Sequence, residues 1–339
     1  MDPCPTPGFT VPGTRLRGVI CCLPSRRVEN AELAVRLGAK PVDDVTAMTG
    51  VETRYYAAPG QTAGDLCLRA AQQLLARMGW DPHTIDALIF VTQTPDQRLP
   101  ATACGLHGHL GLGPRCQAFD VNLGCSGYVY GLWLATALVA AGCRRVLLLA
   151  GDTSSRLVDP LDRTTALLFG DAGSASAIEA DAAAPPAHFV LGTDGTGARH
   201  LAAAGGGYRD PAGPATLVMD GTEVFGFTLR AVPALVRDTL EQAGQTIDAI
   251  DIFALHQANR FMLRHIGKKL SIDPARMPIN IDRYGNTSSA SLPLLICTDL
   301  AEPLTTMPRT VLLAGFGVGY SWGAACLRLD PLACAELVP

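Results

Sequence analysis

The chain has 339 residues, of which 48% are hydrophobic and 17% are charged, and its formal net charge is −4. This charge balance predicts no general affinity for nucleic acid or for an anionic membrane, and no apolar run reaches the roughly 20 residues of a membrane-spanning helix. The length favours about two domains, and the low charged fraction predicts extensive burial in a core or a subunit interface.

The cysteines and the N-terminal segment bear on the cellular compartment. The eleven cysteines are odd in number and include no C-x-x-C pair and no Cys/His metal spacing. Most lie in apolar surroundings, which favours reduced thiols over a disulfide framework. The segment from Met1 to Arg15 is rich in Pro and Gly and lacks the apolar core of a signal peptide. We therefore expect a cytoplasmic protein.

Buried strands and helices are predicted to alternate along the chain. Residues 63–78 show helical spacing, with Leu66, Ala70 and Leu74 on one face. Residues 45–56 are predicted to form a turn and an extended segment. The predicted strands are 17–23, 86–92, 145–151, 173–179, 251–255, 311–315 and 320–329, and the other predicted helices are 29–39, 101–111, 130–139, 229–243, 260–270 and 290–300.

The second half of the chain repeats the first. The helix-then-strand unit that ends in 86–92 recurs before 251–257, an offset of 251 − 86 = 165, and LLLAG at 147–151 recurs as VLLAG at 311–315, an offset of 311 − 147 = 164. Two matches in one order at nearly one offset indicate a duplicated domain. We predict two α/β halves with mostly parallel sheets, residues 1–183 and 184–339, joined by the Ala/Pro-rich segment 180–186. Loops at the carboxyl ends of equivalent strands would then face one crevice.

Cys125 lies in the stretch DVNLGCSGY (120–128), between a strand-like segment and a long helical run. At a helix N-terminus, free N–H groups and the helix dipole stabilise a thiolate, and the glycines on either side leave room for a substrate. This context favours a nucleophile. Free cysteines are more often simply buried, however, so the assignment requires chemical partners elsewhere.

Two polar residues of the second half occur where such partners are expected. His256 ends the apolar strand 251–255, and Asn286 lies in a loop before a helix. Taken singly, a histidine at a strand end is more often structural, and an asparagine beside glycine more often serves a turn or a cap. These alternatives become much weaker when LHQAN (255–259) and RYGNTSSAS (283–291) occur in one chain with Cys125 in GCSGY.

Eight motifs extend in one order across nearly the full length: DVNLGCSGYVYGL (120–132), DPLDR (159–163), LLFGDAGSA (167–175), LGTDGTG (191–197), MDGTEVFGF (219–227), LHQAN (255–259), DRYGNTSSAS (282–291) and GFGVGYSWGAA (315–325). In this combination the chain resembles a β-ketoacyl-acyl-carrier-protein synthase III of the thiolase-fold condensing enzymes. The resemblance implies a thiolase-like α/β fold of two duplicated halves in five αβαβα layers.

The resemblance also implies a Cys125–His256–Asn286 triad. An acyl-CoA or acyl-carrier-protein (acyl-ACP) donor would load Cys125, and malonyl-ACP or malonyl-CoA would then lose CO2 and attack the acyl-cysteine. A neutral His256 and the Asn286 amide would donate hydrogen bonds to the enolate oxygen, and the backbone N–H groups of Cys125 and Val318 would form the oxyanion hole. No metal or redox cofactor would be required, and the protein would be a homodimer.

Further residues acquire substrate or carrier roles through the same resemblance. Arg163 matches an arginine on the adenine side of coenzyme A, and Leu99 matches a position that reaches into the partner subunit's acyl pocket. The adjacent lysines Lys268 and Lys269 match basic positions used by the carrier. An ordinary solvated helix face explains those lysines equally well. The predicted set is Arg163, Leu99, Phe316, Asn259, Lys268 and Lys269.

Several positions depart from the family pattern. Val318 replaces a usual glycine, so this loop must avoid positive φ there. Asp44 and Met48 occupy the region of the family's primer-binding Trp and Arg, and Gly226 stands where a carrier-docking Lys is common. These changes favour a specialised pathway, such as secondary metabolism or modified fatty-acyl synthesis, with a different acyl donor.

Two other functions remain open from the sequence. An acyltransferase of the same fold would pass the Cys125-bound acyl group to a hydroxyl or amine, with His256 as general base. A catalytically silent subunit of a heteromeric synthase is disfavoured because all three triad side chains are present.

Overall fold

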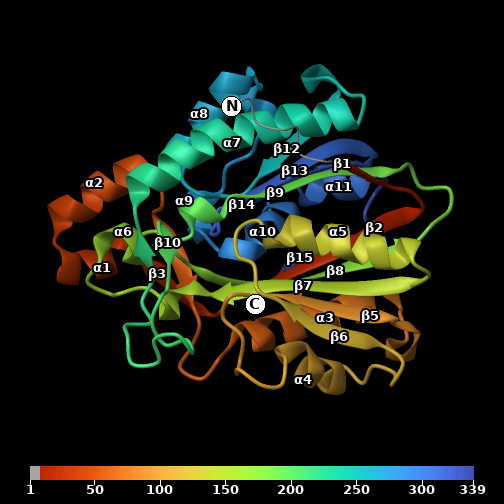
Figure 1. The fold of residues 1–339 in the computed structure, drawn as a ribbon, viewed down its shortest axis with the longest axis horizontal. Coiled ribbons are helices and arrows are strands. Elements are labelled where there is room, and N and C mark those ends of the chain that lie inside the picture. Colours follow the sequence, from red (N-terminus) through yellow and green to blue (C-terminus); the bar gives the residue numbers. More distant parts are fainter. Residues whose placement is uncertain (1–7) are drawn as a thin grey trace.

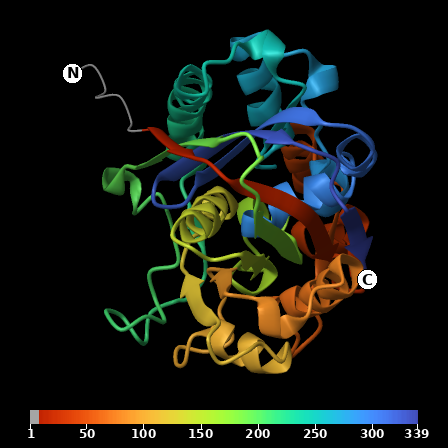
Figure 2. The same cartoon turned by 90° about the vertical axis from the view of Figure 1, so that its right-hand side faces the viewer.

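The computed structural model describes residues 8–339, so Cys4 and the beginning of the Pro/Gly-rich N-terminal segment lie outside the described residues. Two large β-sheets alternate with three layers of helices (Figure 1). Figure 2 shows the middle helix α5 (yellow; Gly127–Ala140) between the sheets. The predicted five-layered arrangement is therefore confirmed.

The first sheet carries the strands that lead to Cys125. Its strand order is β15-β2-β8-β7-β5-β6, and three of its five pairings are parallel. Helices α3 (Ala63–Met78) and α4 (Thr102–His109) cover its outer face (Figure 1). The strands are β2 (Thr14–Cys22), β5 (Ala87–Val91), β6 (Gln117–Val121), β7 (Arg145–Thr153), β8 (Asp171–Ala180) and β15 (Cys334–Val338).

The second sheet carries the strands that lead to His256. Its order is β1-β9-β14-β13-β12, and only the β12–β13 pairing among the described strands of this sheet is parallel. Both sheets are mixed, but the prediction of mostly parallel sheets is wrong here. Helices α7 (Gly221–Gln242) and α8 (Arg260–Leu270) cover its outer face (Figure 1). The strands are β1 (Gly8–Val11), β9 (Ala187–Thr193), β12 (Ile252–Leu255), β13 (Arg309–Gly317) and β14 (Ser321–Leu329).

Helices α5 and α10 (Ser291–Cys297) form the central layer. Both contact strands of the two sheets, and their apolar residues join one large core cluster. A helix that is apolar on all sides is stable in water only when it is buried, as here. The smaller elements are β3 (Arg26–Glu29), α1 (Asn30–Leu37), α2 (Ala39–Thr49), β4 (Thr53–Tyr56), α6 (Arg163–Ala166), β10 (Leu201–Ala202), β11 (Val218–Met219), α9 (Ile281–Tyr284) and α11 (Ala301–Thr306).

The internal repeat recurs in the strand register. Ala87 of β5 pairs with Val146 of β7, and Ile252 of β12 pairs with Val311 of β13. The offset between the two pairs is 252 − 87 = 165 for their first residues and 311 − 146 = 165 for their second residues. The carboxylates before the two strands repeat as well. Asp86 accepts from the backbone N–H of Arg145 at 3.0 Å, and Asp251 accepts from that of Thr310 at 2.7 Å. Equivalent side chains therefore fix equivalent strand ends in the two halves.

The two halves exchange their terminal strands. β1 pairs with β9 in the second sheet, whereas β15 pairs with β2 in the first. The predicted linker 180–186 connects β8 to β9, and the division at residue 183 stays a prediction. Each sheet is thus completed by a strand from the opposite end of the chain.

The segment 45–56 differs from its prediction, because its first residues complete helix α2. Thr46 and Thr49 lower helix propensity but donate their hydroxyls to the carbonyls of Val42 and Val45 at 2.7 and 2.8 Å. Gly50 then ends the helix at a φ of 78°. The predicted helix 229–243 likewise begins earlier, at Gly221, because Asp220 accepts backbone N–H groups of its first turn.

Within residues 8–339 the ten cysteines are free. None of the helices in this range combines the length and apolar character needed to cross a membrane. The same range contains no cluster of three or more His, Cys, Asp or Glu side chains suited to a metal ion.

The close packing of α5 on the first sheet predicts the effect of one added methyl group. A Cβ at Gly131 would lie 2.5 Å from Cδ1 of Leu148 and 2.9 Å from Cγ2 of Val91. We expect Gly131→Ala to lower the free energy of unfolding in urea by about 1–3 kcal/mol. Gly105→Ala in α4 is the matched control, because its Cβ would meet no atom within 4 Å; there we expect a gain of up to about 1 kcal/mol. Equal effects of the two substitutions would contradict this packing.

Candidate active site

Cys125 lies in the turn between β6 and α5. Cys125 is buried, and within the turn the N–H of Gly127 donates to the carbonyl of Gly124 at 2.7 Å. Strand β13 of the second half packs directly against this turn. A Cβ at Gly315 would lie 2.6 Å from the carbonyl oxygen of Cys125, and one at Gly317 would lie 3.1 Å from its Sγ atom. Glycine at both positions is therefore required for the two halves to meet at the cysteine.

His256 follows β12 and is buried. Its backbone N–H donates to the carbonyl of Ala314 at 2.8 Å, which extends the pairing with β13. Its Nδ1 atom lies 2.6 Å from the hydroxyl oxygen of Ser291. The ring meets the ring of Phe316 edge-on, with centroids 5.6 Å apart. Backbone, hydroxyl and aromatic contacts together fix the imidazole.

Asn286 is held by backbone bonds to the first half of the chain. Its N–H donates to Leu168 at 2.9 Å, and its carbonyl accepts from Gly170 at 3.0 Å. The side-chain oxygen accepts from the N–H of Ser288 at 2.9 Å, which leaves the amide Nδ2 group available to donate. Ser288 adopts a φ of 51°, an uncommon conformation for a residue other than glycine.

These three side chains line one cavity of about 520 Å³. Phe316, Val318 and Asn259 also line it. Asn259 in addition caps α8, since its side chain accepts from the N–H of Met262 at 2.7 Å. The structure thus brings together residues that the sequence placed in separate halves, while their catalytic roles stay predictions.

The loop after β13 carries the predicted oxyanion donor. Val318 avoids positive φ, because Ser271 and Ser288 are the non-glycine residues with positive φ in the described chain. The hydroxyl of Ser321 donates to the carbonyl of Val318 at 2.7 Å. The expectation that this loop avoids positive φ at Val318 is confirmed.

Burial determines the charge state of the two reactive groups. It lowers the pKa of His256 to about 3, so the imidazole is neutral. Burial, and secondarily the Asp152 carboxylate, raises the pKa of Cys125 to about 12, and a hydrogen bond with Ser288 opposes this only in part. The stabilisation expected from the helix N-terminus therefore does not bring the pKa of this thiol below its ordinary value. The resting pair is a thiol and a neutral imidazole.

Asp152, which the sequence analysis did not select, also lines the cavity. Its carboxylate accepts from the N–H of Gln93 at 2.7 Å and from the hydroxyl and N–H of Ser289 at 2.7 and 3.2 Å. It therefore ties a loop of the first half to the segment that follows Asn286. The available signal was an acid directly after the buried run LLLAG, at the carboxyl end of a strand.

Four predicted residues lie outside the cavity lining. Arg163 begins α6, beside the lining residue Thr164. Leu99 is 81% exposed on the loop before α4, and its predicted contact with a partner subunit stays a prediction. Lys268 and Lys269 occupy the exposed last turn of α8, where Lys269 donates to the carbonyl of Leu229 at 2.9 Å.

The raised pKa of Cys125 predicts its pattern of alkylation. Thiolate appears only as the pH approaches about 12, so the rate of iodoacetamide labelling at this residue should rise about tenfold per pH unit between roughly pH 7 and 10. Peptide mass spectrometry measures the rate, with exposed Cys104 followed in the same digest as a reference. A plateau near neutral pH would show that a thiolate is already present.

Comparison with known proteins gives matches over nearly the whole chain. Families described as 3-oxoacyl-[acyl-carrier-protein (ACP)] synthase III and as its C-terminal part match residues 119–195 and 240–329. A β-ketoacyl-[acyl-carrier-protein] synthase III of Symbiobacterium thermophilum is 35% identical over 322 residues, which cover 92% of this chain and 97% of the relative.

Solved structures agree with the sequence matches. A 3-oxoacyl-(acyl-carrier protein) synthase from Burkholderia xenovorans superimposes with a TM-score of 0.96 and 47% identity, covering 98% of this chain and 99% of that chain. The priming β-ketosynthase of a polyketide biosynthetic pathway gives a TM-score of 0.85 and 28% identity, and the match covers 95% of this chain and 98% of that chain. The two ranges matched by the family contain Cys125, His256 and Asn286, and the chain belongs to the β-ketoacyl-acyl-carrier-protein synthase III family.

Proposed function

We propose that this protein catalyses a decarboxylative condensation with Cys125 as the nucleophile. The observation that carries the proposal is the shared cavity of Cys125, His256 and Asn286. In the first step the Sγ atom attacks the carbonyl carbon of an acyl thioester. The new C–S bond forms, the donor's C–S bond breaks, and the thiol proton leaves with the departing thiolate. The N–H groups of Cys125 and Val318 would stabilise the tetrahedral oxyanion.

In the second step a malonyl thioester takes the place of the released thiol. Its C2–carboxylate bond breaks, CO2 departs and the electron pair delocalises onto the thioester oxygen. Neutral His256 and the free Nδ2 group of Asn286 can each donate a hydrogen bond to that oxygen. The carbanion then attacks the carbonyl carbon of the acyl-cysteine, and the C–S bond to Cys125 breaks. The β-ketoacyl thioester leaves, and the released Cys125 thiolate takes up a proton from solvent. Neither step requires a metal or a redox cofactor.

The alternative acyltransferase would use His256 as a general base toward a hydroxyl or amine. A base is most effective when its pKa lies near the working pH. The pKa of His256 is lowered to about 3, so this imidazole is a poor proton acceptor at neutral pH. The same property suits a neutral hydrogen-bond donor, which favours condensation.

We further propose an acyl donor other than coenzyme A, and hence a specialised pathway. The described residues that line the cavity include no Lys or Arg, and Arg163 lies outside this lining, so the phosphates of coenzyme A would meet no cation inside the cavity. Apolar side chains occupy the mouth instead. Met48 and Phe261 are 58% and 54% exposed, and Phe261 stacks on Phe225 with centroids 5.6 Å apart.

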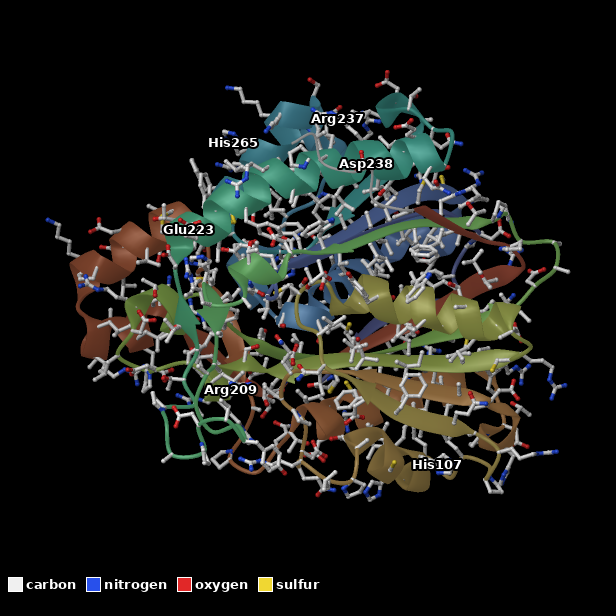
Figure 3. The ribbon with its side chains drawn as sticks, in the orientation of Figure 1. His107, Arg209, Glu223, Arg237, Asp238 and His265 are labelled. Carbon is white, nitrogen blue, oxygen red and sulfur yellow. The ribbon has the colours of Figure 1, made fainter. Side chains whose placement is uncertain are left out.

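A carrier protein is the proposed partner for donor and extender. Arg237 lies on α7 together with Glu223 and Asp238 (Figure 3), whereas α8 carries no Asp or Glu and presents the exposed cations Lys268 and Lys269. Such a face suits an acidic partner.

We also propose a cytoplasmic homodimer in which exposed Leu99 reaches the partner's acyl pocket. A stable monomer in light scattering at micromolar concentration would contradict the dimer.

Variants of the triad should separate the two steps. Cys125→Ala should abolish acyl loading, whereas His256→Ala and Asn286→Ala should still load but lose about 10²–10³-fold in CO2 release, because each removes one donor to the enolate. Intact-protein mass spectrometry measures loading, and labelled malonyl-carrier protein measures CO2. If wild-type protein is loaded but gives ester or amide without CO2, the acyltransferase alternative is correct.

Because no cation lines the cavity, we expect the protein to discriminate only weakly between acyl donors with and without the nucleotide of coenzyme A. We expect kcat/KM for an acyl-CoA and for the matching acyl-pantetheine to differ by less than about threefold, since the phosphates gain no ion pair. Met48→Arg supplies a cation at the mouth and should favour the acyl-CoA, with Met48→Leu as the matched control. A strong preference of the wild-type protein for acyl-CoA would overturn the donor proposal.

A further inference from the structure

Ser291 is a buried serine directly behind the proposed site. It is the first residue of α10 and is 2% exposed. Its hydroxyl oxygen lies 2.6 Å from Nδ1 of His256, and Ser291 is not among the residues that line the cavity. The other ring nitrogen, Nε2, has no hydrogen-bond partner among the described residues, whereas His256 itself lines the cavity.

The direction of this hydrogen bond follows from the donors available. In a neutral imidazole one nitrogen donates and the other accepts. If Nδ1 carried the proton, it would donate to Ser291, and the serine hydroxyl hydrogen would have no acceptor among the described residues. A buried donor without an acceptor is unfavourable. If Ser291 donates to Nδ1, the hydroxyl hydrogen is satisfied and the ring proton resides on Nε2.

We infer that Ser291 is a positioning residue that holds His256 in the tautomer with its proton on Nε2. This inference rests on the proposed condensation and deepens it. The enolate oxygen needs a hydrogen-bond donor, and the Nε2–H tautomer supplies one without any transfer of the ring proton. During decarboxylation the electron pair of the breaking C–C bond moves onto the thioester oxygen, where Nε2–H and the Asn286 amide meet it.

The same tautomer disfavours base catalysis by His256. With Nδ1 occupied by Ser291 and Nε2 already protonated, the imidazole presents no lone pair to a hydroxyl or amine in the cavity. Ser291 therefore biases the site toward the condensation half-reaction. Loading of Cys125 needs no donor from His256 in the proposed scheme, so it should depend little on Ser291.

The test uses the full-length protein and three variants. Ser291→Ala removes the donor, Ser291→Thr retains a hydroxyl, and Thr239→Ala removes a fully buried hydroxyl on α7 that bonds only the carbonyl of Leu235 at 2.7 Å. Ser291→Ala should slow CO2 release from malonyl-carrier protein about tenfold to hundredfold, less than outright loss of a donor. Loading of Cys125 should change by less than about threefold. Ser291→Thr should recover most of the rate, and Thr239→Ala should leave both steps unchanged.

Nitrogen-15 NMR of the histidine rings supplies a readout that a purely structural role would not move. The His256 signals, assigned with His256→Gln, should show protonated Nε2 and unprotonated Nδ1 in the wild type, and a shift toward protonated Nδ1 in Ser291→Ala. Protonated Nδ1 in the wild type would overturn the inference, as would equal slowing of loading and CO2 release in Ser291→Ala. If the wild type releases no CO2 but its tautomer still depends on Ser291, the proposed function fails while the assigned hydrogen bond stands.

Discussion

The close approach of β13 to the Cys125 turn is the contact on which the site depends. Gly315 and Gly317 allow it, because a Cβ at either position would lie within 2.8 Å of Cys125 atoms. This contact joins a nucleophile from the first half to a histidine and an asparagine from the second. Asp152 makes a second connection through Ser289. Cys125, His256 and Asn286 are buried where the halves meet, and the chemistry proposed for the site follows from that burial.

Burial keeps the two titratable side chains of the triad, Cys125 and His256, neutral. The pKa values of Cys125 and His256 move in opposite directions, to about 12 and about 3, and both shifts are caused mainly by burial. An ion pair would require two buried charges, which is costly. The neutral pair instead provides a thiol that loads in the presence of a thioester and a donor for an enolate. The Ser291 hydrogen bond determines which imidazole nitrogen is that donor.

The sequence was sufficient for the features with a regular pattern. The periodicity of residues 63–78 and 260–270 predicted helices with these same bounds, and the repeat at an offset of 165 recurs in the register of β5–β7 and β12–β13. The motifs predicted that Cys125, His256 and Asn286 share one cavity. The mostly antiparallel pairing of the second sheet was missed, because apolar strands of either direction look alike in sequence. The exchange of β1 and β15 was missed because their partner strands lie far away in the chain.

Properties that depend on three-dimensional surroundings could not be predicted. The charge state of Cys125 was missed because local sequence reveals the helix N-terminus but not the depth of burial or the nearby Asp152. Ser291 lies 35 residues from His256, and only the packing of α10 against β12 brings them together. Helix α2 was missed because its threonines satisfy backbone carbonyls in a way that residue preferences do not reveal.

A crystal structure of the Cys125 acyl-enzyme with a non-decarboxylating malonyl thioester analogue would show directly whether the two halves form one condensing site. We expect the acyl group on Sγ of Cys125 and the analogue's thioester oxygen within hydrogen-bonding distance of both His256 Nε2 and Asn286 Nδ2. An acyl group on another residue, or a thioester oxygen that contacts neither side chain, would contradict it.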